Sequence, residues 1–215
     1  MLKTRKLCVF VILLVGFTLI FTACEGLEGG LINFDALYKV GDTGPGGGII
    51  FYVADGQNGR PVGFIDTFSG DRHFYLEAAP EDVTTFENRL QWAVSGHDFK
   101  IDNTLETIGS GRKNTALIVQ QLGINAPAAF ICDNYESDNG TDDWFMPSLL
   151  ELQELFKHNR DNNDVNYSFT SSTYWSSSQS LTRDDSAYYS YTTITRISHG
   201  KAAAESVRPI RSFAN

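Results

Sequence analysis

The chain of 215 residues carries 17 lysines and arginines against 26 aspartates and glutamates, which gives a formal net charge of −9. Such an acidic chain is a poor candidate for non-specific nucleic-acid binding, where cationic side chains must displace the counterions of phosphates. Its 13% aromatic residues argue against disorder, and its three cysteines are too few for a disulfide-dense scaffold.

The N-terminus is typical of a secretion signal. A basic head precedes the apolar run 7–21, which is shorter than the roughly 20 residues that a membrane span needs. Small residues stand directly before Cys24, as in a bacterial lipobox, although Phe21 occupies a position where Leu, Val or Ile is usual. We predict that residues 1–23 are a lipoprotein signal peptide and that Cys24 is lipidated. An uncleaved signal anchor is the alternative.

The remaining chain is predicted to form one domain. Residues 24–35 are glycine-rich and indicate a short flexible tether, and residues 36–215 contain no further linker and no internal repeat. Lipidation of Cys24 and removal of Cys8 would leave Cys132 alone, so no intramolecular disulfide could form. Apolar neighbours predict that Cys132 is buried rather than a nucleophile.

Two strands and a helix are expected first in the domain. Residues 47–54 and 73–78 are rich in β-branched and aromatic side chains, which favour strands. Thr84 and Glu87 form a capping-box pattern, in which the hydroxyl and the carboxylate each satisfy a free amide. This pattern predicts a helix that runs toward Val94.

Two more helices and a group of strands follow. Residues 110–122 form an apolar helical pattern that ends at Gly123. A second capping box, Ser148 with Glu151, begins a helix in which leucines and Phe156 recur at helical spacing. Three stretches rich in Ser, Thr, Tyr and Trp are then expected to form an antiparallel sheet: 170–178, 187–197 and 206–213. The predicted class is α+β, with small antiparallel sheets and two to three helices.

The sequence contains no common catalytic signature. The patterns H-E-x-x-H, G-x-S-x-G and C-x-x-C are absent, and the four histidines lack metal-ligand spacing. Acidic pairs are too numerous for spacing to single out a glycosidase pair. We therefore predict no catalytic residues and a protein that is not an enzyme, with a carbohydrate-active enzyme as a distant alternative.

An acidic loop, residues 133–143, offers hard oxygen ligands that suit calcium. Asp138, Asp142 and Asp143 are the candidate ligands. The loop lacks the EF-hand arrangement, because Trp144 stands at the twelfth position instead of Glu. The alternative is that the carboxylates bond to neighbouring backbone amides, in which case no cofactor is expected.

The stretch from residue 175 to residue 211 has the composition of a recognition surface. Tyrosine provides rigid amphipathic contact area, and Ser and Thr provide adaptable hydrogen bonds. Strand alternation would place Tyr189 and Tyr191 on one face and turn Tyr188 inward. A small local excess of cations would attract an anionic glycan, whereas a polar sheet without a ligand is the plain alternative. The candidate ligand-binding residues are Trp175, Tyr189, Tyr191, Arg196 and Lys201.

Eight blocks of sequence occur in an order that resembles one known family. They are GDTGPGGGIIFY (41–52), LEAAP (76–80), WA (92–93), IGSG with NT (108–115), AA with Cys132 (128–132), DDWFMPS with EL (142–152), YWSSS (174–178) and VRPIR (207–211). Together they resemble the domain at the C-terminus of the Legionella collagen-like protein (the Lcl C-terminal domain), which also occurs in bacterial lipoproteins. The resemblance covers residues 38–213.

The resemblance implies a fold similar to the C-type-lectin-like and formylglycine-generating-enzyme folds. Members are mostly surface or secreted binding modules without a general enzymatic activity, and the collagen-like member is an adhesin for sulfated polysaccharide. We therefore expect a lipid-anchored protein of the cell envelope, at the outer membrane or cell surface, that binds an extracellular glycan or protein and no nucleic acid. A structural envelope protein that assembles into homo-oligomers is the alternative.

Overall fold

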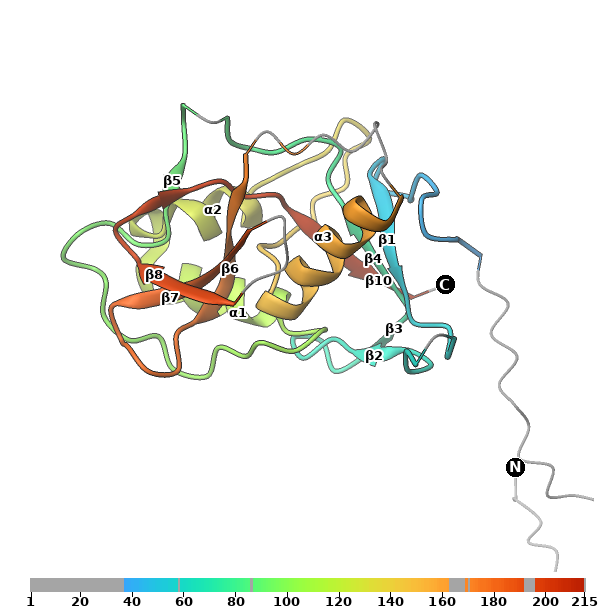
Figure 1. The fold of residues 1–215 in the computed structure, drawn as a ribbon, viewed down its shortest axis with the longest axis horizontal. Helices are drawn as coiled ribbons and strands as arrows, with labels where there is room; N and C mark the ends of the chain where they lie inside the picture. Colours follow the sequence, from blue (N-terminus) through green and yellow to red (C-terminus); the bar gives the residue numbers. More distant parts are fainter. Residues whose placement is uncertain are drawn as a thin grey trace, which may run out of the picture. The chain divides into compact units, whose positions relative to one another are not determined.

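A computed structural model describes residues 37–57, 59–85, 87–162, 169, 171–191 and 196–214, all within one compact unit that spans residues 34–215. The predicted signal peptide, the predicted tether and the predicted lipidation of Cys24 lie outside the described residues. The described chain contains three α-helices and four small antiparallel sheets (Figure 1), which confirms the α+β class.

The first sheet joins both ends of the domain. Its strands are β1 (Ile49–Val53), β4 (Tyr75–Ala78) and β10 (Ile210–Phe213), in the order β1-β4-β10. Ala78 of β4 pairs with Ile49 on one side and with Ile210 on the other. The strands β2 (Phe64–Ile65) and β3 (Arg72–His73) form a separate ribbon. The predicted strand 47–54 is confirmed as β1, and the predicted strand 73–78 is confirmed only as β4, because His73 ends the separate strand β3.

The helices occupy the middle of the chain. They are α1 (Gly111–Leu122), the 3-10 turn η1 (Gly123–Asn125), α2 (Pro127–Asp133) and α3 (Leu149–Asn162). The Ser148–Glu151 capping box is confirmed, because the Ser148 amide donates to Glu151 Oε2 at 2.7 Å and the Glu151 amide donates to Ser148 Oγ at 3.4 Å. The helix α2 was not predicted; it begins at Pro127, a residue that suits the first turn.

One predicted helix is wrong. Among residues 84–94, those that the structure describes form turns and the short strand β5 (Leu90–Gln91), which pairs with β9 (Ala204–Glu205). The Thr84 hydroxyl accepts a hydrogen bond from the Val207 amide at 3.1 Å. The hydroxyl is therefore used by a distant segment and does not cap a helix.

The second larger sheet contains β6 (Thr173–Gln179), β7 (Ser186–Tyr191) and β8 (Ile197–Gly200), in the order β6-β7-β8. The stretch 187–197, predicted as one strand, instead contains nearly all of β7 and the first residue of β8. Residues 192–195 between them lie outside the described part. The predicted strand 206–213 is shorter as well, since β10 begins at residue 210.

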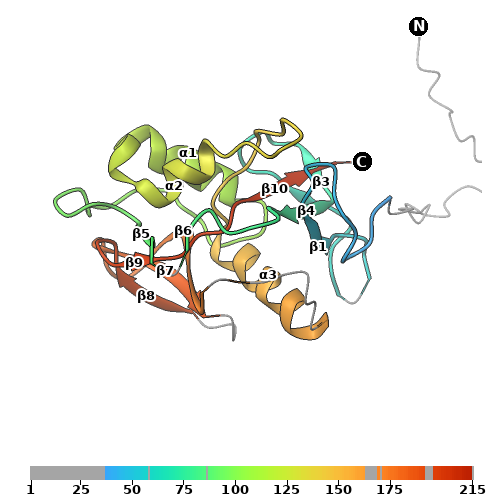
Figure 2. The ribbon, with the colours of Figure 1, turned by 90° about the horizontal axis from the view of Figure 1, so that it is seen from above.

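The β6 side of this second sheet is covered on both faces, whereas most of β8 is exposed. On one face Trp175 and Tyr189 pack in an apolar cluster with Trp92 and with Ile118 of α1. On the other face the ring of Tyr174 lies against Phe156 of α3, at a centroid distance of 5.5 Å. Helix α1 packs against β6, and α3 packs against β6 and β7 (Figure 2). Double coverage is why every residue of β6 is buried.

No single helix in the described ranges is long and apolar enough to cross a membrane. The segments 111–125 and 127–133 meet the length and composition only as a pair that is bent by 117°.

Candidate ligand-binding surface

Four aromatic rings gather where β6, β7 and β8 lie side by side. The antiparallel register pairs Tyr189 with Trp175, and it places His199 on the same face, opposite Ala187. The ring centroid of Tyr189 lies 6.0 Å from that of Trp175 and 5.4 Å from that of His199. Tyr191 continues the row at 5.5 Å from Tyr189. We call Trp175, Tyr189, Tyr191 and His199 the aromatic patch.

The aromatic patch runs from the core to the surface. Trp175 is fully buried, and its Nε1 donates a hydrogen bond to the Leu90 carbonyl at 2.9 Å. Tyr189 is 8% exposed, Tyr191 is 37% exposed, and the side chain of His199 is 49% exposed. A ligand would therefore meet Tyr191 and His199, while Trp175 and Tyr189 support them from beneath.

The hydroxyl of Tyr189 is a fixed donor inside the aromatic patch. It donates to the Tyr191 hydroxyl at 3.4 Å. Burial, this hydrogen bond and the nearby Glu205 carboxylate raise the pKa of Tyr189 to about 12. The phenol is therefore protonated at neutral pH, and it orients the more exposed ring.

A buried carboxylate, Glu205 of β9, anchors the imidazole. Glu205 Oε1 lies 3.1 Å from His199 Nδ1, and Glu205 Oε2 accepts a hydrogen bond from Thr173 Oγ1 at 2.5 Å. Arg89 Nη1 lies 3.6 Å from the same Oε2. Because the carboxylate accepts at Nδ1, a neutral imidazole keeps Nε2 as an acceptor for another partner. The patch thus combines ring surfaces with a polar atom of defined orientation.

Tyr189 and Arg196 differ from their predicted places. Tyr189 was expected on an outer face, but it packs in the cluster with Trp92 and Trp175 and is buried. Arg196 was grouped with Tyr189 and Tyr191, yet its guanidinium lies 4.7 Å from the ring of Tyr188, on the opposite face of β7. Arg196 also pairs with Glu106 at 2.6 Å. It therefore does not belong to the aromatic patch.

Lys201 was predicted to contact ligand, but it is fully buried. Its Nζ donates to the Phe99 carbonyl at 2.6 Å and to Gln179 Oε1 at 2.8 Å, and it lies 4.6 Å from the ring centroid of Trp92. Burial lowers the pKa of Lys201 to about 8. The side chain ties the loop at Phe99 to the sheet, so a ligand at the surface does not reach it.

Sequence reasoning missed His199, Glu205 and Arg89. His199 lies beside the tyrosines only because β8 runs antiparallel to β7. The β-branched residues 192–195 favour a strand in sequence, so one continuous strand was predicted there. The pairing of β5 with β9 sets Glu205 opposite Leu90 and so brings Arg89 to the carboxylate. No short-range pattern predicts this contact.

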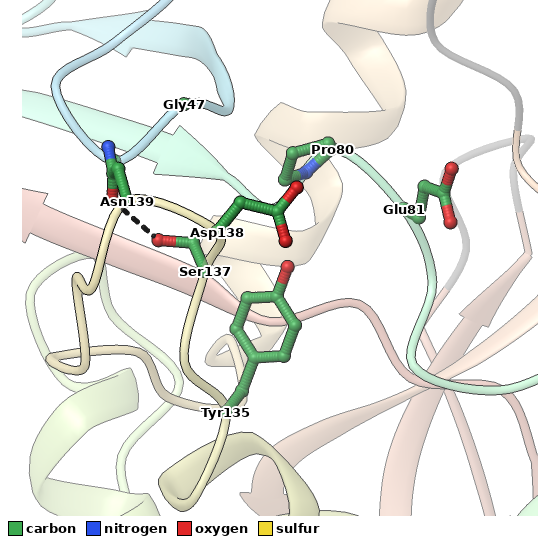
Figure 3. A pocket seen from close by; sticks show the side chains of 8 residues that line it. Gly47, Pro80, Glu81, Tyr135, Ser137, Asp138 and Asn139 are labelled. Atoms are coloured by element: carbon green, nitrogen blue, oxygen red, sulfur yellow. Dashed lines mark hydrogen bonds between the residues drawn. The ribbon is translucent and has the colours of Figure 1, made fainter.

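The acidic loop does not collect its carboxylates at one point. Asp143 is held by Arg211, whose Nε and Nη2 donate to its two oxygens at 2.6 and 3.0 Å. Asp142 is exposed, and Asp138 lines a separate hollow beside Tyr135 (Figure 3). Within the part of the chain that the structure describes, no group of three or more His, Cys, Asp or Glu side chains could hold a metal ion. The calcium hypothesis for Asp138, Asp142 and Asp143 therefore finds no geometric support.

Cys132 is buried as predicted, and the C-terminal arginines Arg208 and Arg211 are paired with carboxylates. Cys132 is a free, fully buried cysteine, and burial raises the pKa of its thiol above the usual range. Arg208 pairs with Asp82, and Arg211 pairs with Glu77 as well as with Asp143. These cations are thus compensated by carboxylates of the interior and are not offered to an anionic ligand.

Comparison of the chain with protein-family models and with curated proteins gives no match. The resemblance to the Lcl C-terminal domain therefore rests on the eight motif blocks quoted above.

Proposed function

We propose that the protein is a lipid-anchored binding module of the bacterial cell envelope, at the outer membrane or cell surface, with one C-type-lectin-like domain. Cys24 would carry the lipid, and the domain would bind an extracellular glycan without catalysing a reaction. The motif blocks support the Lcl-like fold, and the lipobox supports the anchor. The α+β class of the described chain is compatible with both.

The observation that carries the binding proposal is the exposed edge of the aromatic patch. Tyr191 and His199 present ring surface to solvent on a support of two buried rings. Glu205 fixes the imidazole, so little side-chain entropy remains to be lost on binding. Sugars offer hydroxyls and apolar C–H faces together, and rings beside a polar acceptor match both. This composition favours a saccharide over a purely ionic ligand.

A glycan and glycosaminoglycan array, probed with the full chain at moderate salt, tests this proposal. We expect a reproducible saccharide hit, and we expect Tyr191→Ala and His199→Ala each to weaken binding at least tenfold. Phe68→Ala is the matched control, because Phe68 is a 55% exposed aromatic between β2 and β3. Addition of chelator is expected to leave binding unchanged. A blank array from folded protein, or equal affinity for all three variants, would reject the assignment.

Self-assembly into an envelope structure is the second candidate, and one observation favours it. In the described chain β8 pairs with β7 alone, and Ile197 on β8 is 38% exposed. A sheet edge of this kind can add the strand of another copy. Light scattering of the full chain distinguishes the two functions: a stable oligomer that Ile197→Lys dissociates would support assembly, and a monomer would exclude it.

A further inference from the structure

A shallow apolar hollow of about 680 Å³ lies between α2 and the segment that leads into β5. Its apolar lining consists of Val83, Leu90, Ile124, Pro127, Phe130 and Ile131. Ile124 in η1 is 74% exposed, although it is a large aliphatic side chain. Contiguous exposed apolar surface on a soluble domain marks a place where another molecule packs.

A second hollow, of about 310 Å³, meets the first at Tyr135, which lines both. The exposed carboxylates of Glu81 and Asp138 belong to this second hollow. Figure 3 shows the Tyr135 hydroxyl pointing toward the carboxylate of Asp138, with Glu81 to one side. Burial and the charges of Asp138 and Glu81 raise the pKa of Tyr135, so its hydroxyl is protonated at neutral pH.

The charged residues that line the second hollow are all acidic. Glu81 and Asp138 form no ion pair among the described residues, and neither does Glu136, which lines the apolar hollow. Asn139 is already used, because its Oδ1 accepts from Ser137 and its Nδ2 donates to the Pro45 carbonyl. Uncompensated carboxylates beside a tyrosine ring select a cationic group.

We propose that the two hollows form one docking surface for a segment of a partner protein in which apolar side chains adjoin a lysine or arginine. The apolar residues would fill the hollow at Ile124, and the cation would enter between Glu81 and Asp138. A sulfated glycan or an anionic lipid surface would meet the repulsion of three carboxylates. A neutral saccharide would leave hydroxyls unsatisfied against the aliphatic lining. The charge of the surface therefore favours a basic, amphipathic peptide.

Selection from a displayed library of random twelve-residue peptides on the full chain tests this proposal. We expect enriched peptides that place lysine or arginine next to apolar residues and that bind more weakly as salt increases. Ile124→Asp, and the double variant Glu81→Gln with Asp138→Asn, should each weaken the binding of a selected synthetic peptide at least tenfold. These side chains are exposed, so the variants are expected to retain the wild-type thermal midpoint.

Matched controls separate this surface from general effects of charge and from the aromatic patch. Leu181→Asp introduces the same charge at a side chain that is 73% exposed, and Asp71→Asn with Asp184→Asn removes two exposed carboxylates elsewhere. Both controls, and Tyr191→Ala, should bind the peptide as the wild type does. Enriched peptides without a cation, unchanged affinity of the Glu81 and Asp138 variant, or no peptide that binds above background would each overturn the proposal.

Discussion

Two buried glutamates hold two glycine-containing loops, and they differ in how their charge is compensated. Glu77 of β4 accepts the amides of Gly46 and Gly48 at 3.1 and 2.8 Å and pairs with Arg211 at 3.0 Å. Glu151 of α3 accepts the amides of Gly109 and Ser148 at 2.8 and 2.7 Å. In the described chain no cation forms an ion pair with Glu151.

Backbone amides alone thus offset only part of the free-energy cost of burying a carboxylate. Both side chains are fully buried. Hydrogen bonds to Glu151 favour its charged form, but burial outweighs them and raises its pKa to about 7. At Glu77 the guanidinium of Arg211 provides the opposite charge, and Asp143 holds that guanidinium in place. One loop is thus fixed by an ion pair, and the other by a group that titrates near neutral pH.

The largest effect is expected from Glu77→Ala. This substitution leaves the amides of Gly46 and Gly48 without their acceptor and removes one partner of Arg211, whose side chain is only 11% exposed. We expect a cost of roughly 3–5 kcal/mol of unfolding free energy. Equilibrium unfolding in urea measures this loss.

The control for Glu77→Ala is Asp143→Ala, which removes the other carboxylate that Arg211 contacts. The side chain of Asp143 is 28% exposed, so solvent replaces much of the lost interaction. We expect a cost of about 1 kcal/mol. If the two variants lost equal unfolding free energy, the burial of Glu77 would not make its ion pair with Arg211 more stabilising than that of Asp143.

Glu151→Gln is predicted to change the pH dependence of stability. The folded pKa of about 7 lies above the ordinary value of 4.5, so the folded state binds more protons at Glu151 between these pH values. The stabilisation is complete below pH 4.5 and is lost as the pH rises to about 7, a difference of roughly 3 kcal/mol for the wild type. The Glu151→Gln variant should lack this decrease of the unfolding free energy with rising pH. Unfolding free energies at half-unit steps from pH 4.5 to pH 8 measure it.

Glu154→Gln provides the matched control on the same helix, because Glu154 is partly exposed and paired with Arg60 at 3.3 Å. Its pH profile should follow the wild type. Burial lowers the pKa of His73, and that residue titrates in all three proteins, so the differences between profiles isolate Glu151. Parallel profiles for wild type and Glu151→Gln would show that Glu151 stays charged in the folded protein.

Sequence predicted the elements whose signals are local. The capping box at Ser148 formed because its partners lie three residues apart on one helix, and α1 ended at Gly123 because its φ of 53° suits glycine. The similar pattern at Thr84 failed because the Val207 amide, far along the chain, takes the hydroxyl. Local patterns therefore compete with contacts that the sequence does not reveal.

The candidate site was predicted only in part for the same reason. Trp175, Tyr189 and Tyr191 do lie together, since strand alternation and pairing place them on one face. His199 and Glu205 were missed, because they enter through the reversal before β8 and through the pairing of β9 with β5. Lys201 was misplaced because composition gives no information on depth, and its ammonium lies against Trp92 in the interior.

The smallest losses of unfolding free energy are expected from substitution of the glycines that lie against the Glu77 and Glu151 carboxylates. A Cβ at Gly44 would overlap the Glu77 carboxylate, and a Cβ at Gly111 would overlap Glu151 Oε2. Each glycine-to-alanine substitution should cost about 1–3 kcal/mol, because the glutamate must move away from its amide donors. Gly200→Ala is the control, since nothing lies within 4 Å of that Cβ. It should change the unfolding free energy by less than about 0.5 kcal/mol.

A double-mutant cycle assigns the cost at Gly111 to the carboxylate itself. With Glu151→Ala already present, the overlap with the carboxylate is removed, and only the milder contacts with Phe145 Cε2 and the Ser148 backbone nitrogen, both at 2.9 Å, remain. The additional cost of Gly111→Ala should therefore fall below its cost in the wild type. The same cycle with Gly44→Ala and Glu77→Ala should show a comparable coupling, since steric overlap does not depend on whether the glutamate has an ion-pair partner. Strict additivity in either cycle would place the strain in the backbone rather than at the carboxylate.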